Sequence, residues 1–428
     1  MDVSAREKEE NSTFTVLVTG ANSGLGFALC CRLIDEFLYT RPQSQTLHLL
    51  YSTRDTRKGD DTQKRLQAHL QRTLREANGK TLGISLLLEA RVKIEGVLVD
   101  LLKLTTVKTL AEQLLRRGQR IDAVVCNAGV AGWLGINWPK AIWTVCTDLV
   151  QAVTYPTYMN CDVGARAKTQ VQKTTTDVDE PVLGEVFTAN VFGHYLLVHW
   201  LGPLMNDTSR VIWISSTGAV ADTFRADDIQ GLKSLAAYES SKRLTDILVL
   251  TSELPATKPY TTSYFSSTTQ KDTRPKMLVT HPGVVATSIS GLHWFLSFFM
   301  TAALYFARVL GSPWHAIEPY KGAVSMAFAV LAPQLMEQES REGKGKWGSA
   351  TSVQGDERVA RTEVEGWGYC GKPGVIPPGS ATNGLYRERK ETTRESREEF
   401  EELGRGVWKE MEEMRNVWER RLGPLDQA

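Results

Sequence analysis

The glycine-rich turn that begins at Thr19 is the feature that most constrains the fold. The run FTVLV, which starts at Phe14, is short, apolar and partly β-branched, and it leads directly into TGANSGLG. An apolar-periodic stretch then continues to Leu38. This order predicts a strand, a tight turn and a helix. Glycines in such a turn allow the backbone to approach a pyrophosphate, and the helix N-terminus supplies free N–H groups and a partial positive charge.

The same alternation continues along the chain. Apolar runs at 47–52, 93–100 and 121–129 are separated by helical stretches at 61–77 and 105–117. Strands and helices that alternate at these lengths predict a Rossmann-type, doubly wound α/β fold, in which helices cover both faces of a parallel sheet.

After an interruption the alternation resumes with a long helix at 183–204, a strand at 209–216 and a helix that carries Tyr238 and Lys242. The run KMLVTHPGVV, from Lys276, supplies a further strand and turn. About six strands are clear, and we expect a seventh near an edge of the sheet, as is common in this fold.

Three segments depart from the pattern. Residues 132–181 contain three tryptophans and a polar run, and we interpret them as an insertion that forms a surface loop or flap. We place the Rossmann domain at 13–335 and a charged C-terminal extension at 336–428. Apolar residues from Phe400 to Leu422 recur on one helix face, which predicts an amphipathic terminal helix. It would pack on the body or on a partner subunit, or else lie on a membrane surface.

Composition excludes few functions. Lysine and arginine number 50 and aspartate and glutamate 49, so a formal charge of +1 gives no reason to expect a nucleic acid partner. The 6 cysteines form no C-x-x-C pair, and we expect reduced thiols and no metal site. The charged start of the chain has no apolar core, which argues against a secretory signal peptide.

Tyr238 and Lys242 are a candidate catalytic pair. They stand four apart in AAYESSKRLTD, about one helical turn, so both side chains project from the same helix face. An ammonium group beside a phenol favours the phenolate and lowers the tyrosine pKa from about 10, which suits proton transfer. The alternative is a half-buried tyrosine with a solvated lysine one turn later, and the motif alone does not separate the two.

The motifs that accompany Tyr238 and Lys242 along the chain separate these two interpretations. The motifs T-G-x-x-x-G-x-G, N-A-G, a serine, Y-x-x-x-K and P-G occur in this order, and the chain from about residue 14 to 290 resembles the short-chain dehydrogenase/reductase family. The resemblance implies that Tyr238 donates a proton to a carbonyl oxygen and that Ser216 hydrogen-bonds the same oxygen, with Ser215 as the rival serine. It implies that Lys242 binds the nicotinamide ribose and lowers the tyrosine pKa, and that Asn190 anchors a proton-relay water.

The same resemblance implies a nicotinamide cofactor. An acidic residue after the second strand would accept a hydrogen bond from a ribose hydroxyl, whereas this chain has Arg54, which can pair with a 2′-phosphate, so we expect NADPH. A solvated loop arginine is the alternative. The cofactor-binding residues that the family pattern implies, in addition to Tyr238 and Lys242, are Thr19, Gly20, Asn22, Ser23, Gly24, Leu25, Gly26, Arg54, Asp100, Asn127, Ala128, Gly129, Pro282, Gly283 and Thr287.

Two further features point to the substrate. An added segment, DTFRADDIQG, lengthens the stretch between Ser216 and Tyr238, and with the IWISS strand and the long tail it resembles the 3-keto-steroid reductases of sterol C-4 demethylation, particularly the fungal ones. This implies reduction of the 3-ketone of a sterol intermediate to the 3β-alcohol in ergosterol-type biosynthesis. It also implies a location at the cytosolic face of the endoplasmic reticulum or on lipid droplets, with other sterol enzymes as partners, and it leaves a homo-oligomer open.

The apolar and aromatic segment 291–310 suits a large apolar substrate. We interpret it as a substrate lid that dips into a membrane surface, with a transmembrane helix and a buried core helix as alternatives. Two other functions stay open on the sequence alone. One is reduction of another lipophilic carbonyl, such as a retinal or a 17-ketosteroid, and the other is a catalytically silent scaffold for sterol enzymes.

Overall fold

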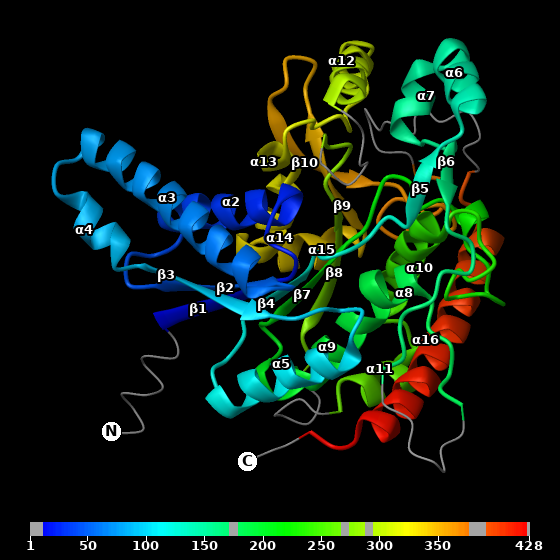
Figure 1. Ribbon diagram of the computed structural model, residues 1–428, viewed down its shortest axis with the longest axis horizontal. Helices are drawn as coiled ribbons and strands as arrows, with labels where there is room; N and C mark the ends of the chain where they lie inside the picture. Colours follow the sequence, from blue (N-terminus) through cyan, green and yellow to red (C-terminus); the bar gives the residue numbers. More distant parts are fainter. Residues whose placement is uncertain (1–11, 171–178, 267–273, 287–293, 376–390, 426–428) are drawn as a thin grey trace.

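An eight-stranded sheet lies at the centre of the protein. The computed structural model describes residues 12–170, 179–266, 274–286, 294–375 and 391–425. In the sheet the strands follow the order β10-β9-β8-β7-β4-β1-β2-β3 (Figure 1). Neighbours from β3 to β9 run parallel, and β10 runs antiparallel to β9. The strands are β1 (Thr13–Val18), β2 (Thr46–Thr53), β3 (Val92–Leu98), β4 (Ala123–Cys126), β7 (Arg210–Ile214), β8 (Lys276–His281), β9 (Lys346–Thr351) and β10 (Glu357–Thr362).

Helices cover both faces of this sheet, which confirms the doubly wound fold (Figure 1). Each face has its own apolar cluster, because successive side chains of a strand point to opposite faces. One face is covered by α2 (Gly24–Thr40), α3 (Thr56–Lys80), α4 (Ile84–Glu89), α13 (Pro319–Gly322), α14 (Val324–Leu331) and α15 (Leu335–Glu342). The other is covered by α5 (Leu104–Arg117), α8 (Glu185–Phe187), α9 (Gly193–Trp200), α10 (Ala237–Thr251), α11 (Lys258–Tyr264) and α16 (Arg394–Leu422).

The sheet extends beyond residue 335, where we expected the Rossmann domain to end. β9 is the seventh parallel strand, and β10 is an eighth that the sequence did not indicate. All residues of β9 are buried although half of its sequence, KWGSAT, is polar. Lys346 is buried because its Nζ donates to Asp246, and Ser349 is buried because its Oγ donates to the carbonyl of Gly322. Internal polar partners make this a core strand, so an apolar pattern could not reveal it.

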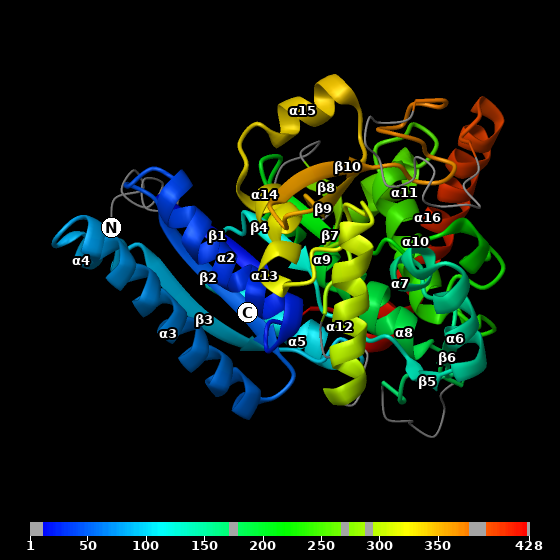
Figure 2. The ribbon, with the colours of Figure 1, turned by 90° about the horizontal axis from the view of Figure 1, so that it is seen from above.

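The expected insertion is more ordered than a loop or flap. It contains a small antiparallel sheet of β5 (Trp133–Ile136) and β6 (Met159–Cys161) and two helices, α6 (Trp138–Thr147) and α7 (Leu149–Thr154). Helix α12 (Trp294–Val309), from the apolar segment 291–310, packs beside α7 (Figure 2).

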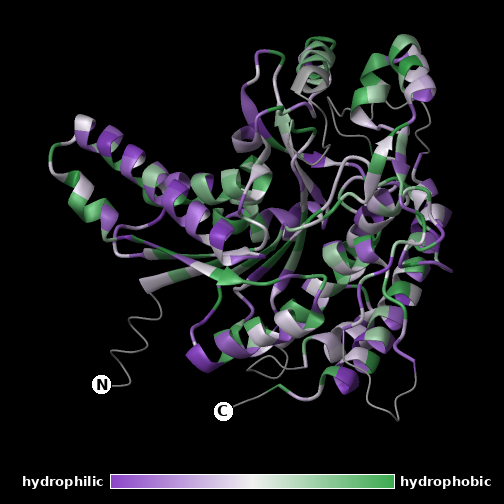
Figure 3. Cartoon of the chain, in the orientation of Figure 1, coloured by the Kyte–Doolittle hydropathy of each residue, from purple (hydrophilic) through white to green (hydrophobic). Residues whose placement is uncertain are grey.

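These helices carry apolar residues at their surface (Figure 3). The exposure of α12 excludes a core helix, because Phe298 is 66% and Phe306 is 54% exposed. Within the described residues, we find no helix that combines the length and the apolar character needed to cross a bilayer. Exposed large apolar side chains on α6 and α12 include Trp138, Ile142, Trp143, Val145, Phe298, Phe299, Tyr305, Phe306 and Val309.

The C-terminal helix α16 packs on the body of the protein, along α10 and α11 (Figure 2). Trp408 is fully buried, and its Nε1 donates to the carbonyl of Leu248 in α10 at 3.1 Å. Gly404 lies so close to α10 that a Cβ atom there would stand 2.5 Å from Thr251. Of the three arrangements that the sequence left open for this helix, packing on the body is therefore the observed one.

Candidate active site

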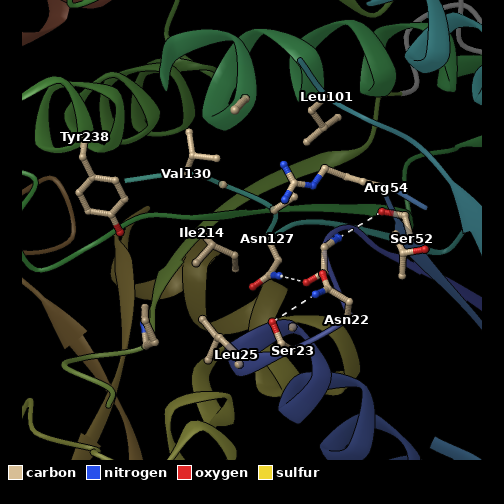
Figure 4. A pocket seen from close by; sticks show the side chains of 18 of the residues that line it. Asn22, Ser23, Leu25, Ser52, Arg54, Leu101, Asn127, Val130, Ile214 and Tyr238 are labelled. Atoms are coloured by element: carbon tan, nitrogen blue, oxygen red, sulfur yellow. Dashed lines mark hydrogen bonds between the residues drawn. The ribbon is translucent and has the colours of Figure 1, made fainter. Parts of the chain in front are cut away.

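One cavity of about 390 Å³ collects most of the predicted site residues at the carboxyl ends of the parallel strands (Figure 4). Thr19 and Asn190 are not among the residues that line it, and Thr287 lies outside the described residues. The predicted residues that do line it are Gly20, Asn22, Ser23, Gly24, Leu25, Gly26, Arg54, Asp100, Asn127, Ala128, Gly129, Ser216, Tyr238, Lys242, Pro282 and Gly283.

The glycine-rich turn requires its glycines for close backbone packing. Gly20 has φ +68°, and a Cβ atom there would lie 2.8 Å from Cα of Ala128. At Gly26 a Cβ atom would lie 2.3 Å from the carbonyl oxygen of Gly20. Helix α2 begins here, and Ser23 at its N-cap makes no side-chain capping hydrogen bond. The first N–H groups of a helix have no partner within it, so this N-terminus is suited to bind a phosphate group.

Thr19 and Asn127 fix the glycine-rich turn through hydrogen bonds. The Oγ1 of Thr19 accepts hydrogen bonds from the backbone N–H groups of Asn127 at 2.9 Å and Ala128 at 3.0 Å. The Nδ2 of Asn127 donates to the carbonyl of Thr19 at 2.9 Å. Thr19 thus ties β1 to the end of β4 and shapes the cavity without lining it.

The end of β2 forms the opposite side of the cavity from Tyr238 (Figure 4). The Oγ of Ser52 accepts from the backbone N–H of Gly20 at 3.1 Å, which fixes this strand end against the turn. Arg54 lines the cavity and has an exposed side chain. A guanidinium group at this place can form paired hydrogen bonds with a phosphate. The cavity therefore fits a nicotinamide dinucleotide, with its pyrophosphate at the start of α2.

The candidate catalytic residues come together at the ends of β7 and α10. The side chain of Ser216 lies close enough to the Tyr238 phenol to affect its pKa, and Nζ of Lys242 lies 5.5 Å from the centre of the Tyr238 ring. Lys242 donates to the carbonyl of Ile214 at 2.8 Å. Burial lowers the pKa of Lys242 to about 8, and the nearby ammonium of Lys346 acts in the same direction.

The structure separates Ser216 from its rival. Ser215 is buried, accepts a hydrogen bond from Nζ of Lys346 at 2.9 Å and donates to the carbonyl of Lys242 at 3.3 Å. Ser216 instead faces Tyr238. Ser216 is therefore the serine beside the tyrosine, and its catalytic role stays a prediction.

The expected effect of Lys242 on Tyr238 is not what this structure shows. Burial raises the pKa of Tyr238 above its ordinary value, with a smaller contribution from the charge of Glu239, and the neighbouring side chain of Ser216 only opposes this. The opposite direction was predicted from the motif alone. A phenol whose pKa is raised stays protonated at neutral pH, and this is the form that a proton donor needs.

Asn190 lies on a π-helical turn, Thr188–Phe192, that interrupts the helix expected at 183–204. Its side chain bridges two segments: Oδ1 accepts from the backbone N–H of Val130 at 2.8 Å, and Nδ2 donates to Oγ of Ser241 at 3.0 Å. Asn190 therefore connects the segment after the N-A-G motif with helix α10. The proton-relay role stays a prediction.

Comparison with known proteins agrees with this geometry. No family model matches the chain. The 3-keto-steroid reductase erg27 of Aspergillus fumigatus is 43% identical over 434 residues, which cover 95% of this chain and 94% of that protein. The chain belongs to the 3-keto-steroid reductase family. A second member, 3-keto-steroid reductase ERG27 of Gibberella zeae, is 38% identical over 95% of this chain and 94% of its own length.

Similarity to solved structures is weaker. A crystal structure of a mutant actinorhodin polyketide ketoreductase with NADPH matches at a TM-score of 0.41 and 18% identity, over 76% of this chain and 92% of that chain.

Sequence reasoning missed three residues of the reductase site. The ring of Trp133, from the insertion, lies 5.5 Å from the ring of Tyr238 in an edge-on arrangement. His281 accepts a hydrogen bond from the backbone N–H of Gly283 at 3.1 Å, which fixes the P-G turn that lines the cavity. Lys346 binds both serines at the end of β7. His281 stands directly before P-G and Trp133 four residues after N-A-G, so their positions in the chain offered a signal, whereas Lys346 lies far from every motif in sequence.

Proposed function

We propose that this protein uses NADPH to reduce the 3-ketone of a sterol intermediate to the 3β-alcohol, as sterol C-4 demethylation requires. The observation that carries the proposal is the meeting of Ser216, Tyr238 and Lys242 at one end of a dinucleotide-sized cavity. Family membership supports the substrate, because two relatives that match over nearly their whole length are named 3-keto-steroid reductases.

The residues supply the proton and orient the ketone. When bound, the reduced nicotinamide supplies a hydride to the carbonyl carbon. Ser216 and Tyr238 are placed to donate hydrogen bonds to the carbonyl oxygen, where negative charge develops. Tyr238 then transfers its proton to this oxygen, so that the ketone becomes a secondary alcohol. Lys242 holds the ribose side of the site and carries a positive charge near the phenol, which stabilises the tyrosinate that remains.

Trp133 adds an apolar wall beside the proton donor. Its ring stands edge-on to Tyr238 and is partly buried, so a flat apolar ring system could lie against it. Exclusion of water around the carbonyl strengthens the hydrogen bonds from Ser216 and Tyr238.

The choice of NADPH over NADH rests on Arg54. The residue that ends β2, and those next to it, would face the adenosine ribose of a dinucleotide whose pyrophosphate lies at α2. The sequence here is Tyr51-Ser52-Thr53-Arg54, with no carboxylate to repel a 2′-phosphate. The guanidinium group of Arg54 supplies the positive charge that this phosphate requires.

The test of the activity is oxidation of NADPH by the purified protein with a 3-keto sterol, compared with Tyr238→Phe. We expect turnover in the wild type and a loss of at least about a hundred-fold in kcat in the variant, since general acid catalysis contributes this much. Tyr39→Phe is the matched control, because this tyrosine is 65% exposed at the end of α2. Tight NADPH binding without reduction of any 3-keto sterol would contradict the proposed substrate.

We propose in addition that α6 and α12 bind a membrane surface, at the cytosolic face of the endoplasmic reticulum or on lipid droplets. The exposed apolar side chains of the two helices support this location, since exposed apolar surface often marks a site of membrane or partner contact. A sterol that is dissolved in lipid would then reach the cavity from the same side. Other sterol-biosynthesis enzymes on that membrane are the partners that we propose.

Vesicle flotation tests the membrane proposal. Trp143→Glu on α6 and Phe306→Glu on α12 place charges at positions that are 72% and 54% exposed, and we expect both to reduce binding to phosphatidylcholine vesicles. Leu86→Glu is the matched control, because Leu86 is 76% exposed on α4, far from these helices in Figure 1. Equal flotation of all variants would refute the proposed surface.

A further inference from the structure

A second buried lysine stands behind the catalytic residues. Lys346 is the first residue of β9, where it pairs in register with Val279 of β8. Its Nζ donates hydrogen bonds to the carbonyl of Ser216 at 2.7 Å, to Oγ of Ser215 at 2.9 Å and to Oδ2 of Asp246 at 2.8 Å. A lysine ammonium has three donors, so this arrangement uses all of them.

The three contacts join three elements. Ser215 and Ser216 follow the end of β7, whereas Asp246 lies on α10, one helical turn after Lys242. The side chains of Lys346 and Asp246 are only 4% and 0% exposed. The distance between Ser216 and helix α10 is therefore set by an ion pair in the core and not by a contact that solvent could replace.

The position of the ion pair is informative because such pairs add little net stability. Removing two charges from water costs several kcal/mol per ion, and well-packed apolar residues often do as well or better. A geometric role explains better why a lysine stands here. The Ser216 hydroxyl must meet Tyr238, and the contact of Lys346 with the Ser216 carbonyl holds the backbone from which this hydroxyl projects.

We propose that Lys346 is a positioning residue of the reductase: held by Asp246, its ammonium group fixes the Ser215–Ser216 backbone against helix α10, so that Ser216 and Tyr238 bind the substrate carbonyl together. This inference rests on the proposed function. It assigns a role in the site to β9, a strand that contributes none of the family motifs.

The same pair acts on Lys242 through its charge. The groups whose charges influence Lys242 are Lys346 on β9, Asp246 on α10 and Cys126 on β4. On α9, burial lowers the pKa of His194, and the charge of Lys242 acts in the same direction. The phenol of Tyr238 faces Lys242 on α10. Lys346 lowers the pKa of Lys242 and Asp246 raises it. Removal of Lys346 alone should therefore raise the pKa of Lys242, whereas removal of both Lys346 and Asp246 should leave this pKa nearly unchanged.

Two variants test the role. Lys346→Met removes the contacts to the serines and leaves the Asp246 carboxylate uncompensated, whereas Lys346→Met with Asp246→Asn removes the contacts without leaving a buried charge. Lys344→Met is the matched control. Lys344 also ties the chain near β9 to the end of α10, through Ser252 at 2.9 Å and Glu253 at 3.0 Å, but it does not touch the site.

The measurements are kcat and KM with NADPH and a 3-keto steroid, the pH midpoint of NADPH binding above pH 7, and thermal unfolding. For Lys346→Met we expect kcat to fall about a hundred-fold with little change in KM, because a displacement of about 1 Å in a catalytic group has an effect of this size. The binding midpoint should move to higher pH. In the double variant the midpoint should return toward the wild-type value while kcat stays low, and Lys344→Met should keep the wild-type kcat.

Three results would overturn the inference. A folded Lys346→Met protein with wild-type kcat would show that the serine needs no such support. Recovery of kcat in the double variant would show that Lys346 only neutralises Asp246. Failure of both variants to fold would show that Lys346 is needed for folding and not for positioning the site. A wild-type protein that binds NADPH but reduces no 3-keto steroid would instead contradict the proposed function, and the shift of the binding midpoint would still test the link between Lys346 and Lys242.

Discussion

Replacement of Arg54 by glutamine should convert a preference for NADPH into near-equal use of NADPH and NADH. Arg54 lines the cavity at the end of β2 and has an exposed side chain. A hydrogen bond to a charged group contributes about 1.5–3 kcal/mol, and the exposure of Arg54 places its contribution in the lower half of this range. Since about 1.4 kcal/mol corresponds to a factor of ten, NADPH affinity should fall roughly 10-fold to 50-fold. NADH lacks the 2′-phosphate, so its affinity should hardly change.

The assay is titration of cofactor fluorescence with NADPH and with NADH at two salt concentrations. Arg75→Gln is the matched control, because Arg75 is exposed on α3 and its Nε donates to the carbonyl of Gln71, away from the cavity. The control should leave both affinities unchanged. Equal loss of NADPH and NADH affinity in Arg54→Gln would refute the reasoning, because it would mean that Arg54 contacts a group that both cofactors share. The wild-type preference for NADPH should also weaken at the higher salt concentration.

Three further predictions concern the fold and the turn. Trp408→Ala should lower the free energy of unfolding in urea by about 3–5 kcal/mol, because the indole is fully buried between α16 and α10, whereas Trp143→Ala at an exposed site should change it by less than about 0.5 kcal/mol. Gly20→Ala should abolish NADPH binding, because φ is +68° and the new Cβ would meet Ala128, and Gly79→Ala on α3, where a Cβ meets nothing within 4 Å, should be neutral or slightly stabilising. The Asp35 carboxylate raises the pKa of His69 to about 10. The stabilisation by this pair is therefore complete below the unfolded histidine pKa of about 6.5, and it is lost as pH rises through about 10. His69→Gln should accordingly destabilise the protein at pH 6 and make little difference to its stability above pH 10.

The motif residues could be predicted from sequence because local backbone geometry dictates them. The turn at Gly20 needs a positive φ and a close approach to Ala128, and only glycine supplies both. Tyr238 and Lys242 are one helical turn apart, so their spacing also follows from local structure. The resemblance to a family then gave these residues their roles.

Tertiary partners account for what the sequence could not supply. Whether Ser215 or Ser216 faces Tyr238 depends on Lys346, which is separated from Ser215 by 131 positions. The expected seventh strand, β9, could not be located in the sequence for the same reason, because its polar residues are buried through distant partners and not through an apolar pattern. The pKa of Tyr238 was predicted in the wrong direction because the motif shows the neighbouring lysine but not the burial of the phenol.

The late position of α16 in the chain has a consequence for biosynthesis. Trp408 and the Leu248 carbonyl that it binds are separated by 160 positions, and Lys346 and Asp246 by 100. At about 5–20 residues per second, helix α10 leaves the ribosome roughly 8–32 s before the tryptophan that covers it. Until Trp408 follows, the nascent chain exposes an apolar face of α10, and until Lys346 follows, Asp246 lacks the lysine that pairs with it. A chain whose synthesis stops before α16 therefore carries the motifs of the site but leaves the apolar face of α10 exposed. Such a chain would be a target for chaperones.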